Sequence, residues 1–384
     1  MSLSLFDVGL ADIKRRKGRK WTRYGPDVIP MWIADSDFHL APQVTEAIVE
    51  ALAEEDVGYG DDSEARRMMA NKIVHRNNIQ AEPENVLITQ GVLPAMWLAC
   101  RYACEPGDEV IVTDPMYYPF FEAVESVGAR LVYWRLNHDE GYQFDTNRLN
   151  ELISPRTKLV FVCNPHNPTG RAMTRGELNG LADIVVDHGL TVMADELWED
   201  VLYDGRQHIS LASLSPEISE RTMTSFGFSK MFSVAGLQVG YLTSTNGEMM
   251  EKVRRIGNRV LRGTSTLSIA AAKVMLSEKV KQYSQDALTH LQRMRNLTFQ
   301  MLSEVEDVTC NRVESTYLAF PRVDKPTPRS TTMAEYLLEE ARVAVEDGSR
   351  YGPSSRSHIR INFGTGEAVI NEAVARIATA LDRL

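Results

Sequence analysis

Short apolar runs alternate with helical stretches through the middle of the chain, and this alternation limits the possible folds more than any other feature. The runs lie at residues 85–89, 109–115, 130–136, 158–165 and 190–196. Between the last two, Thr174 and Glu177 form a capping-box pattern, and the helical stretch that follows ends at Gly189. Strands that alternate with helices predict an α/β fold, in which a largely parallel sheet is covered by helices on both faces.

The two ends of the chain differ from this middle region. Residues 1–40 are irregular, and helical spacing of apolar residues begins near position 41. From about residue 270 the chain becomes rich in helices, with strand candidates at 316–320 and 358–363. We therefore expect an N-terminal segment over residues 1–40, a large domain over 41–275 and a smaller α+β domain over 276–384.

Charge and cysteine content narrow the setting in which the protein works. The net charge of −10 argues against a nucleic-acid partner, and the basic cluster from Lys14 to Lys20 is short enough to be a solvated segment. No apolar run approaches the ~18–20 residues of a membrane span, and the first residues lack the order of a signal peptide. Four cysteines without a CxxC pair favour a reduced, cytoplasmic setting. We expect neither a membrane partner nor a metal.

Polar residues follow the apolar runs, at the points where the predicted strands end. Open parallel sheets bind ligands at the carboxyl ends of their strands, so these residues are the candidates for a site. They are Gly91, Tyr117, Asn167 with Gly170, Asp195, and Ser229 with Lys230. Taken singly, each has an ordinary explanation as a turn, a helix cap, a core residue or a surface lysine. Their common position at strand ends predicts that they gather on one rim of the sheet.

Pyridoxal phosphate is a ligand that such a set can hold. The Lys230 amine can form an imine with its aldehyde, and the Asp195 carboxylate can pair with the ring nitrogen. The Asn167 amide can donate to the ring oxygen, and Tyr117 can stack on the ring. A helix that begins after Gly91 can offer backbone N–H groups to the phosphate. The small apolar residues around Lys230 also predict a lowered lysine pKa, because burial disfavours the charged amine.

Three motifs together resemble a known family. They are NPHNPTG at residues 164–170, ADE at 194–196 and FSK at 228–230. The combination resembles the class I/II aminotransferase superfamily of fold-type I pyridoxal-phosphate enzymes, and the resemblance covers essentially the whole chain. It implies a mostly parallel seven-stranded sheet sandwiched by helices. It also implies a smaller α+β domain formed by the two chain ends, so that residues 1–40 pack with the small domain.

The resemblance implies roles for individual residues as well. It makes Lys230 the catalytic lysine that carries the cofactor, and Arg360 the arginine that holds the substrate carboxylate, a task suited to a bidentate guanidinium. Tyr59 matches a tyrosine that reaches the phosphate of the neighbouring subunit, which implies a homodimer with shared active sites. The implied cofactor-binding positions are Tyr59, Gly91, Val92, Leu93, Tyr117, Asn167, Asp195, Trp198, Ser229, Lys230 and Gln238.

Departures from the common pattern favour one branch of the superfamily. Gln238 stands where typical aminotransferases have a phosphate-binding arginine, Gly227 where a hydroxyl is frequent, and Trp198 where tyrosine is usual. Gln238 and Gly227, together with residues 20–38, resemble the cystathionine β-lyase and cysteine-conjugate C–S lyase branch. Other motifs, such as INFGTG at residues 361–366, also resemble aspartate-type aminotransferases.

The expected activity is a reaction at Cα of a small-molecule amino acid. The first expectation is a C–S β-lyase, in which Lys230 removes the Cα proton and the products are a thiol, pyruvate and ammonia. The alternative is an aminotransferase that passes the amino group to a 2-keto acid. A nicotinamide dehydrogenase is disfavoured because no GxGxxG follows a strand. A role through a regulatory protein partner, which the resemblance to this branch also implies, stays open.

Overall fold

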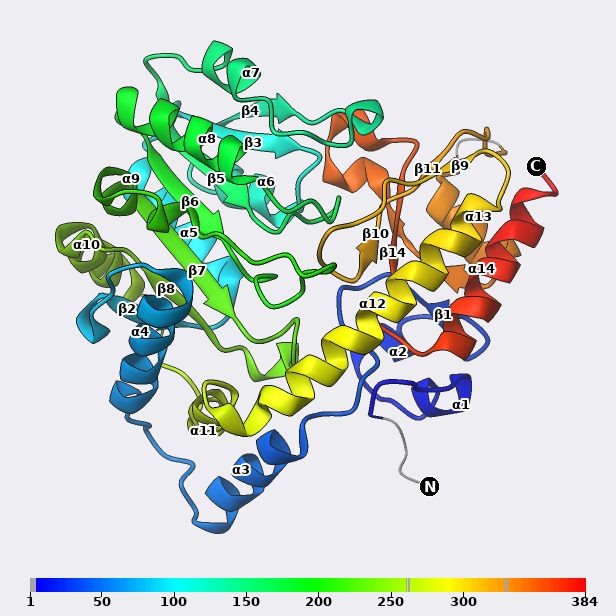
Figure 1. Cartoon of the computed structure of the whole chain (residues 1–384), viewed down its shortest axis with the longest axis horizontal. Coiled ribbons are helices and arrows are strands. Elements are labelled where there is room, and N and C mark those ends of the chain that lie inside the picture. Colours follow the sequence, from blue (N-terminus) through cyan, green and yellow to red (C-terminus); the bar gives the residue numbers. More distant parts are fainter. Residues whose placement is uncertain (1–4, 260, 262, 329–330) are drawn as a thin grey trace.

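A computed structural model describes residues 5–259, 261, 263–328 and 331–384. Its main layer is a seven-stranded sheet with the strand order β2-β8-β7-β6-β5-β3-β4 (Figure 1). The strands are β2 (Val86–Thr89), β8 (Gly240–Thr243), β7 (Thr222–Gly227), β6 (Thr191–Asp195), β5 (Thr157–Cys163), β3 (Glu109–Asp114) and β4 (Arg130–Arg135). Neighbouring strands from β7 to β4 are parallel, which confirms the predicted α/β fold class.

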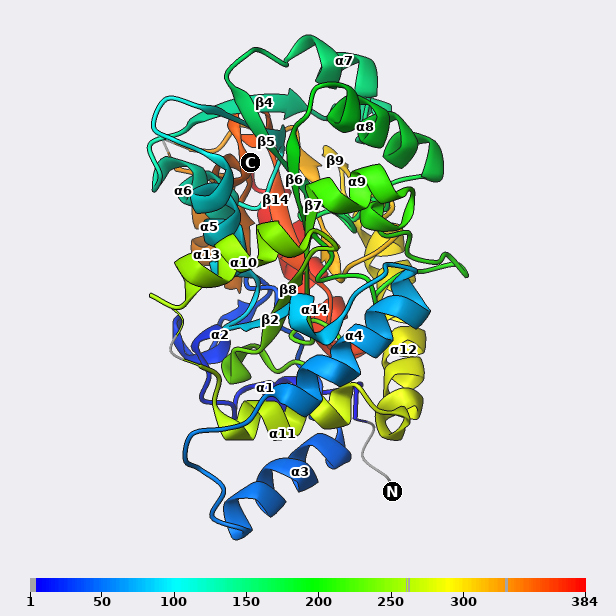
Figure 2. The same cartoon turned by 90° about the vertical axis from the view of Figure 1, so that its left-hand side faces the viewer.

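Helices cover both faces of this sheet, as the sequence predicts. One face packs against α5 (Val92–Ala103), α6 (Pro119–Glu125) and α10 (Gly247–Gly257). The other face packs against α7 (Thr146–Glu151), α8 (Arg175–Asp187) and α9 (Pro216–Arg221). Figure 2 shows these two helix layers with the sheet between them. In β3, Val110 and Val112 join the first core and Ile111 joins the second, so the strand is buried on both sides.

Strand β8 runs antiparallel to both of its neighbours, β2 and β7. It brings Gly240 against the backbone of Gly91, the residue before α5. A Cβ atom at position 240 would lie 3.0 Å from the Gly91 backbone and 3.1 Å from the Phe226 carbonyl oxygen. Glycine is therefore needed at position 240 so that β8 can pack against the turn before α5.

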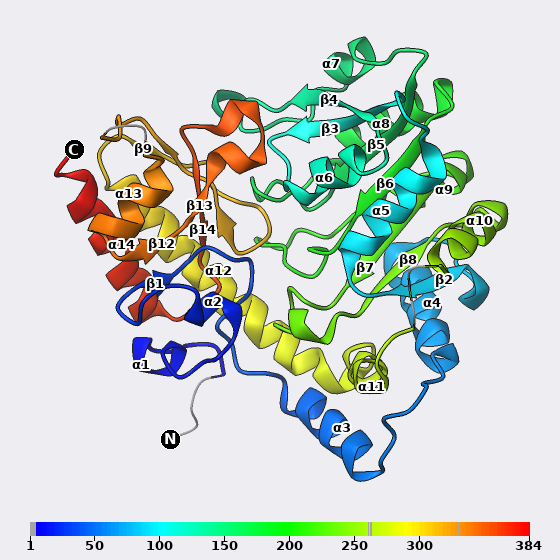
Figure 3. The ribbon, with the colours of Figure 1, turned by 180° about the vertical axis from the view of Figure 1, so that it is seen from behind.

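Three small sheets form a second region, built from both ends of the chain. The three-stranded sheet has the order β10 (Leu318–Ala319), β14 (Ile359–Asn362) and β13 (Glu346–Asp347). Strand β9 (Val308–Thr309) pairs with β11 (Arg322–Val323), and β1 (Ile29–Pro30) pairs in parallel with β12 (Val343–Ala344). The pairing of β1 with β12 joins the N-terminal residues to the C-terminal part of the chain, beside α13 (Met333–Glu340) and α14 (Glu367–Leu381) (Figure 3).

Helix α12 (Lys281–Ser303) connects the two regions. Figure 1 shows it running diagonally from α11 (Thr266–Met275) to the small sheets, with α3 (Pro42–Ala53) and α4 (Ser63–Asn77) beside its starting end. Short 3-10 helices are η1 (Pro83–Asn85), η2 (His138–Glu140), η3 (Leu211–Ser213), η4 (Ala235–Leu237), η5 (Glu278–Val280), η6 (Gly348–Tyr351) and η7 (Pro353–Ser355). Among the residues placed by the structure, no helix combines the length and the apolar character that crossing a membrane requires.

The prediction that the basic cluster from Lys14 to Lys20 is a solvated segment is wrong for Lys20, which is buried. The cluster lies between α1 (Leu10–Ile13) and α2 (Arg19–Thr22), and Lys20 in α2 is buried. Its Nζ lies 2.9 Å from Asp37 Oδ1 and donates to the Asp35 carbonyl oxygen at 2.7 Å. A run of charges in the sequence does not reveal which member has a buried partner, because that partner lies in a separate segment.

Candidate active site

A cavity of about 240 Å³ lies at the carboxyl ends of the parallel strands. Its lining includes Gly91, Val92, Leu93, Tyr117, Asn167, Asp195, Trp198, Ser229, Lys230 and Gln238. The sequence predicts all of these as site residues, and the structure brings them around one space. Of the other two predicted residues, Arg360 bonds to Asn167 at the cavity wall, and Tyr59 is not part of the lining.

Lys230 follows β7 and lines this cavity. Its Nζ donates a hydrogen bond to the Ala34 carbonyl oxygen at 2.8 Å and lies 5.4 Å from the centre of the Trp198 ring. Burial lowers the pKa of Lys230 to about 8, although the nearby Asp35 carboxylate opposes this effect. A substantial fraction of the amine is therefore neutral near pH 8, and the neutral form is the one that attacks an aldehyde.

Asp195 ends β6 and lies beside Cys163, its partner at the end of β5. The Leu197 backbone N–H donates to Asp195 Oδ1 at 3.0 Å, and the Cys163 thiol donates to Oδ2 at 3.8 Å. Burial raises the pKa of Asp195 to about 6, while the Leu197 hydrogen bond and the Lys230 charge act in the opposite direction. A cation that enters the cavity would favour the ionised carboxylate, so this side chain suits a protonated ring nitrogen.

Helix α5 begins at the cavity with uncapped backbone N–H groups. Gly91 is the N-cap residue, with a φ of +94°, and no side chain caps the helix. A Cβ atom built on Gly91 would meet nothing within 4 Å, so the space in front of the helix is open. Free N–H groups and the positive end of the helix dipole make this space suitable for an anion such as a phosphate.

Arg360 reaches the cavity wall from β14 and is only 3% exposed. Its Nη1 donates to Asn167 Oδ1 at 3.1 Å, and its Nη2 donates to the Trp32 carbonyl oxygen at 2.9 Å. The guanidinium also lies over the Tyr351 ring, 5.1 Å from its centre. The remaining Nε–H is buried without a hydrogen-bond partner. Because a buried donor without a partner is costly, this arginine is prepared for an anionic ligand.

Aromatic rings form part of the cavity wall. Tyr117 is half-buried, and its ring centre lies 5.1 Å from that of Tyr118. Burial raises the pKa of Tyr117 to about 12, so its hydroxyl keeps its proton at neutral pH. Trp198 is buried and packs edge-on against Tyr317, with ring centres 4.7 Å apart. Trp198 thus presents a ring face to Lys230 in place of the hydroxyl that a tyrosine would supply.

The structure gives a physical reason for one of the two other departures from the common pattern. A Cβ atom at Gly227 would lie 2.8 Å from Leu197 Cδ1, so Leu197 fills the space that a side chain at position 227 would need. Gln238 is exposed at the edge of the cavity and has a left-handed backbone, with a φ of +49°. Gly227 and Gln238 contribute no positive charge to the cavity. A phosphate beside them would therefore be bound by the backbone N–H groups at the start of α5.

Three residues that the sequence did not single out also belong to the site. Ala34 lines the cavity and accepts the hydrogen bond from Lys230, which lies 196 residues away in the chain. Asp35 acts on the pKa of Lys230, and Cys163 contacts Asp195. Cys163 lies near the end of the run at residues 158–165 that the sequence predicts as a strand, so this position could have identified it as a candidate site residue. No local pattern connects residues 34 and 35 with position 230, because the contact depends on the tertiary fold.

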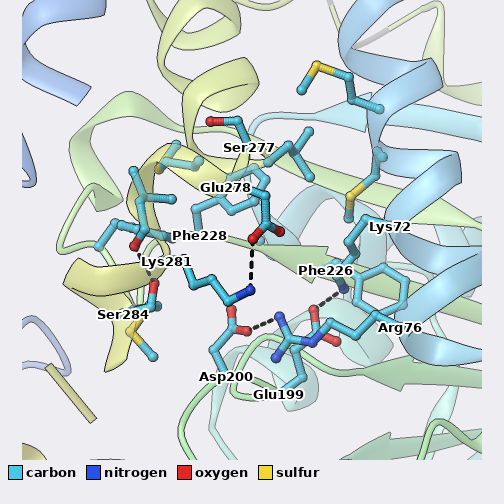
Figure 4. Close-up of a pocket in the computed structure, with 18 of the residues that line it drawn as sticks. Lys72, Arg76, Glu199, Asp200, Phe226, Phe228, Ser277, Glu278, Lys281 and Ser284 are labelled. Atoms are coloured by element: carbon cyan, nitrogen blue, oxygen red, sulfur yellow. Dashed lines mark hydrogen bonds and ion pairs between the residues drawn. The ribbon is translucent and has the colours of Figure 1, made fainter. Parts of the chain in front are cut away.

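A larger cavity, of about 490 Å³, lies between α4 and the start of α12 (Figure 4). Lys72 pairs with Glu199, and Figure 4 shows this pair beside the Phe226 ring. Arg76 pairs with Asp200, and Lys281 pairs with Glu278. These ion pairs neutralise one another, and none of these groups is left for proton transfer or covalent chemistry. The lysine and the aspartate that suit covalent and acid–base chemistry line the smaller cavity instead.

Glu196, Glu199 and His208 lie close enough together to suggest metal ligands. Their atoms already have protein partners, however. His208 Nε2 lies 2.8 Å from Glu196 Oε2, and Lys72 is paired with Glu199. A lysine ammonium beside a carboxylate competes with a cation, so this group is explained as a buried ion-pair network next to Asp195.

Comparisons with known proteins agree with this geometry. The family model for aminotransferase class I and II matches residues 26–377. Cystathionine beta-lyase PatB of Bacillus subtilis (strain 168) is 29% identical over 94% of this chain and 96% of its own. Aromatic-amino-acid aminotransferase 2 of Thermococcus litoralis is 28% identical over 92% of each chain. The crystal structure of cystalysin from Treponema denticola, which contains pyridoxal 5'-phosphate, has the same fold, with a TM-score of 0.91 at 24% identity and full coverage of both chains. Since the family match spans nearly the whole length, the chain belongs to the aminotransferase class I and II family.

Proposed function

We propose that this protein is a pyridoxal-phosphate-dependent enzyme that acts at Cα of an amino acid. The observation that carries the proposal is the meeting of three groups at one cavity: the Lys230 amine, the Asp195 carboxylate and the open start of α5 at Gly91. These groups match the aldehyde, the ring nitrogen and the phosphate of the cofactor. Membership of the aminotransferase class I and II family supports the same cofactor.

The residues around the cavity fit the cofactor. Asp195 would pair with the ring nitrogen, and Tyr117 would stack on the ring. Asn167 uses its carbonyl oxygen for Arg360, so its amide N–H groups serve the ring oxygen. The first N–H groups of α5 would hold the phosphate, and Val92, Leu93, Ser229 and Gln238 also line the cavity.

The side chains divide the chemical work between them. Bound pyridoxal phosphate supplies an aldehyde that exchanges amines and a ring that draws electrons from Cα. Arg360 binds the substrate carboxylate and fixes the orientation of the Cα–H bond. The Lys230 amine takes the proton from Cα, and Asp195 holds a proton at the ring nitrogen.

For the reaction itself we propose a C–S β-lyase, in which a thiol leaves from Cβ and pyruvate and ammonia follow. Gln238 and Gly227 support this branch, as does the similarity to the B. subtilis lyase. The alternative is an aminotransferase that uses a 2-keto acid, and the similarity to the T. litoralis enzyme supports it.

Product analysis separates the two reactions. The holoenzyme is incubated with cystathionine alone, and in parallel with an amino acid plus 2-oxoglutarate. Pyruvate, ammonia and a free thiol from the first mixture are the expected result. Glutamate and a new keto acid from the second mixture, without products from the first, would replace the lyase by the aminotransferase. Products from neither mixture, with a protein partner captured by the purified chain, would favour a regulatory role.

Removal of the lysine amine tests the cofactor-bound mechanism directly. Lys230→Ala should lose the visible absorbance of the lysine-bound cofactor, and turnover should fall by several orders of magnitude, about 10³-fold or more, because both attachment and proton transfer use this amine. The exposed Lys279→Ala is a matched control and should keep both properties. Retained turnover in Lys230→Ala would refute the assigned role.

We further propose a homodimer in which Tyr59 of each chain serves the phosphate of its partner. Tyr59 is fully exposed in the single chain, which leaves it available to a neighbour.

Within each chain, we propose that residues 41–275 form the large cofactor-binding domain. Residues 276–384, together with the segment 1–40, form the small domain. Four free cysteines, three of them buried, support a reducing, cytoplasmic setting.

A further inference from the structure

Strand β14 and the residue before it present two side chains to the same side, because alternate residues of an extended chain point the same way. Arg360 and His358 are two residues apart, and His358 lies directly before the first residue of the strand. Each makes a contact across to the seven-stranded region. Arg360 Nη1 bonds to Asn167 Oδ1 at 3.1 Å, and His358 Nε2 lies 3.3 Å from His138 Nδ1. The carboxylate-binding arginine and a histidine pair therefore bridge the same two parts of the molecule.

His138 is the centre of this second bridge. It lies in η2, after β4, and its Nδ1 is also 3.0 Å from the Tyr142 hydroxyl oxygen. Its Nε2 lies 3.3 Å from Thr309 Oγ1, and its carbonyl oxygen accepts from Asn311 Nδ2 at 2.9 Å. We assign the His138 Nδ1 lone pair as the acceptor from His358 and Tyr142, and the His138 Nε2–H as the donor to Thr309, because the reverse assignment would leave a buried N–H without an acceptor at His358 Nδ1. Both imidazoles are then neutral.

The packed rings of Phe320 and Tyr351 connect His358 with Arg360. Phe320 is stacked on His358, with ring centres 4.9 Å apart and an angle of 17° between the planes. Phe320 in turn packs edge-on against Tyr351 at 5.5 Å, and the Arg360 guanidinium lies 5.1 Å from the centre of the Tyr351 ring. A shift of His358 therefore reaches the guanidinium both through the backbone of β14 and through these packed rings.

We propose that His138 is a positioning residue for Arg360: through its hydrogen bond with His358 it fixes β14 against the seven-stranded region, and protonation of the pair loosens the grip on the substrate carboxylate. This inference rests on the proposed role of Arg360 as the carboxylate ligand. His138 does not touch the substrate, so its effect falls on binding and alignment, and the proton transfer by Lys230 is left intact.

The electrostatics of the pair give the direction of the pH dependence. Burial is the largest cause that lowers the pKa of His358, the neighbouring His138 and Arg322 act in the same direction, and Asp324 and Asp139 oppose them; together they bring this pKa to about 4. Burial and Arg322 also lower the pKa of His138. Both imidazoles are thus held neutral, and the contact is complete above their ordinary pKa of 6.5. It is lost as the pH falls from there toward 4, because charging the pair places two donors face to face.

His358 adds a second cost to protonation. Its Nδ1 is buried and has no hydrogen-bond partner. In the neutral ring this nitrogen is an acceptor, whereas in the charged ring it becomes a buried N–H without an acceptor. Leaving such a donor unpaired is more costly than leaving an acceptor unpaired beside a neutral ring, so the charged form disfavours the native position of β14.

The test separates alignment from chemistry by steady-state kinetics at several pH values. In His138→Ala, the KM for the amino acid substrate should rise by about tenfold at pH 8, since one neutral hydrogen bond is lost, while kcat changes by less than about twofold. In His138→Asn, the side-chain oxygen can accept from His358 in place of Nδ1, so the KM should stay near the wild-type value. The wild-type KM should rise as the pH falls below 6.5, and this rise should be smaller in His138→Asn.

Nuclear magnetic resonance of the histidine side chains gives a readout that does not depend on turnover. In the wild type, the His358 resonance should titrate well below pH 6.5, and in His138→Ala its midpoint should move upward, because one of the groups that lowers its pKa is gone. An unchanged KM in a folded His138→Ala would overturn the positioning role. Arg360→Lys keeps the charge and loses the fork geometry, so its KM should rise strongly. An unchanged KM in that variant would refute the carboxylate role of Arg360 itself, and the two failures are therefore distinguishable.

Discussion

Burial shifts the pKa values of Lys230 and Asp195 in the cavity in opposite directions. It favours the neutral amine of Lys230, whose pKa falls to about 8, and the neutral acid of Asp195, whose pKa rises to about 6. The first shift prepares a nucleophile and a base. The second means that Asp195 gains most from a cationic partner, such as a protonated ring nitrogen. The same low-polarity surroundings therefore prepare both the Lys230 amine and the Asp195 carboxyl group to interact with the cofactor.

The shifted lysine pKa predicts the pH at which the cofactor attaches. The rate at which pyridoxal phosphate joins the apoprotein should rise with pH and reach half of its plateau near pH 8, well below the ordinary lysine value of 10.5. The reason is that only the neutral amine attacks the aldehyde. Stopped-flow absorbance of the apoprotein mixed with the cofactor across pH 6 to 10 measures this profile.

Asp35 supplies the control for this measurement. Its carboxylate opposes the effect of burial on Lys230, so Asp35→Asn should move the midpoint of attachment to lower pH. Thermal unfolding checks that the variant remains folded. A midpoint near 10 in the wild type, or a shift to higher pH in Asp35→Asn, would contradict the proposed electrostatic surroundings of Lys230.

At the scale of elements, α12 connects the two regions, and one ion pair between a buried arginine and an exposed aspartate attaches it to the loop after β6. Arg295 on α12 is fully buried (0% exposed) and binds Asp204 through both nitrogens, at 2.7 and 2.8 Å. Its guanidinium also lies 4.6 Å from the centre of the Tyr203 ring. The loop after β6 is thus attached to the helix, and the position of α12 depends on a charge that cannot reach water.

Breaking this pair should destabilise the protein. Asp204→Ala removes the carboxylate, while Arg295 keeps its hydrogen bonds to Asn296 Oδ1 and the Val313 carbonyl oxygen, so the free energy of unfolding should fall by about 2 kcal/mol. Urea unfolding followed by tryptophan fluorescence measures the change. Asp286→Ala, at an exposed position of the same helix, is the matched control and should change stability by less than about 0.5 kcal/mol. Equal effects of the two substitutions would show that the ion pair does not fix α12.

The NPHNPTG loop is positioned by a glycine at its end. Gly170 has a φ of +68°, and its carbonyl oxygen accepts from the Ser315 backbone N–H at 2.9 Å. A Cβ atom at position 170 would overlap the Val313 side chain and lie 3.0 Å from the Ser315 carbonyl oxygen. The loop that carries Asn167 is therefore packed directly against the segment that leads into β10.

A pair of glycine substitutions separates strain from packing at this loop. Gly170→Ala should lower the free energy of unfolding by about 2–4 kcal/mol, from the left-handed backbone and the overlap together. Gly141→Ala has a similar φ of +66° with nothing within 4 Å, so only the conformational cost of about 1 kcal/mol remains. Differential scanning calorimetry of both variants measures the difference. Equal losses would mean that the loop yields to the added methyl group.

The elements that the sequence predicts well are those with a strong local pattern. The Thr174–Glu177 capping box forms as expected, and the runs at residues 109–115 and 158–165 become the largely buried strands β3 and β5. The run at 130–136 becomes the edge strand β4, in which only Trp134 is buried. The pairing of β1 with β12 and the direction of β8 were not predicted. Two-residue strands have no periodicity, and the direction of a strand depends on the path of the chain around it. The contact of Lys230 with Ala34 is missed for the same reason, because it exists only in the folded chain.

At the scale of the whole molecule, several large apolar side chains remain uncovered. Val49, Leu52, Val57 and Tyr59 are exposed on α3 and the loop after it, and Leu93 is exposed at the rim of the cavity. Exposed apolar groups of this kind are typical of an interface, and a second copy of the chain is the partner that the proposed homodimer supplies.

A mixture of two inactive variants tests whether the sites are shared. Tyr59→Ala and Lys230→Ala homodimers each carry one lesion in every site, so both should be inactive or strongly impaired. In a mixed dimer with sharing between chains, one site carries both lesions and the other carries none. Random exchange of subunits should therefore restore about a quarter of the wild-type activity.

The control uses two residues that both lie in the cavity of their own chain. Mixing Lys230→Ala with Asp195→Ala leaves one lesion in every site of the mixed dimer, so activity should not return. Recovery in the Tyr59 mixture alone means that Tyr59 acts across the interface. If the Tyr59 mixture also stays inactive after subunit exchange is verified by native mass spectrometry, Tyr59 serves its own chain or no site at all. In that case the exposed apolar side chains of α3 would need a different partner.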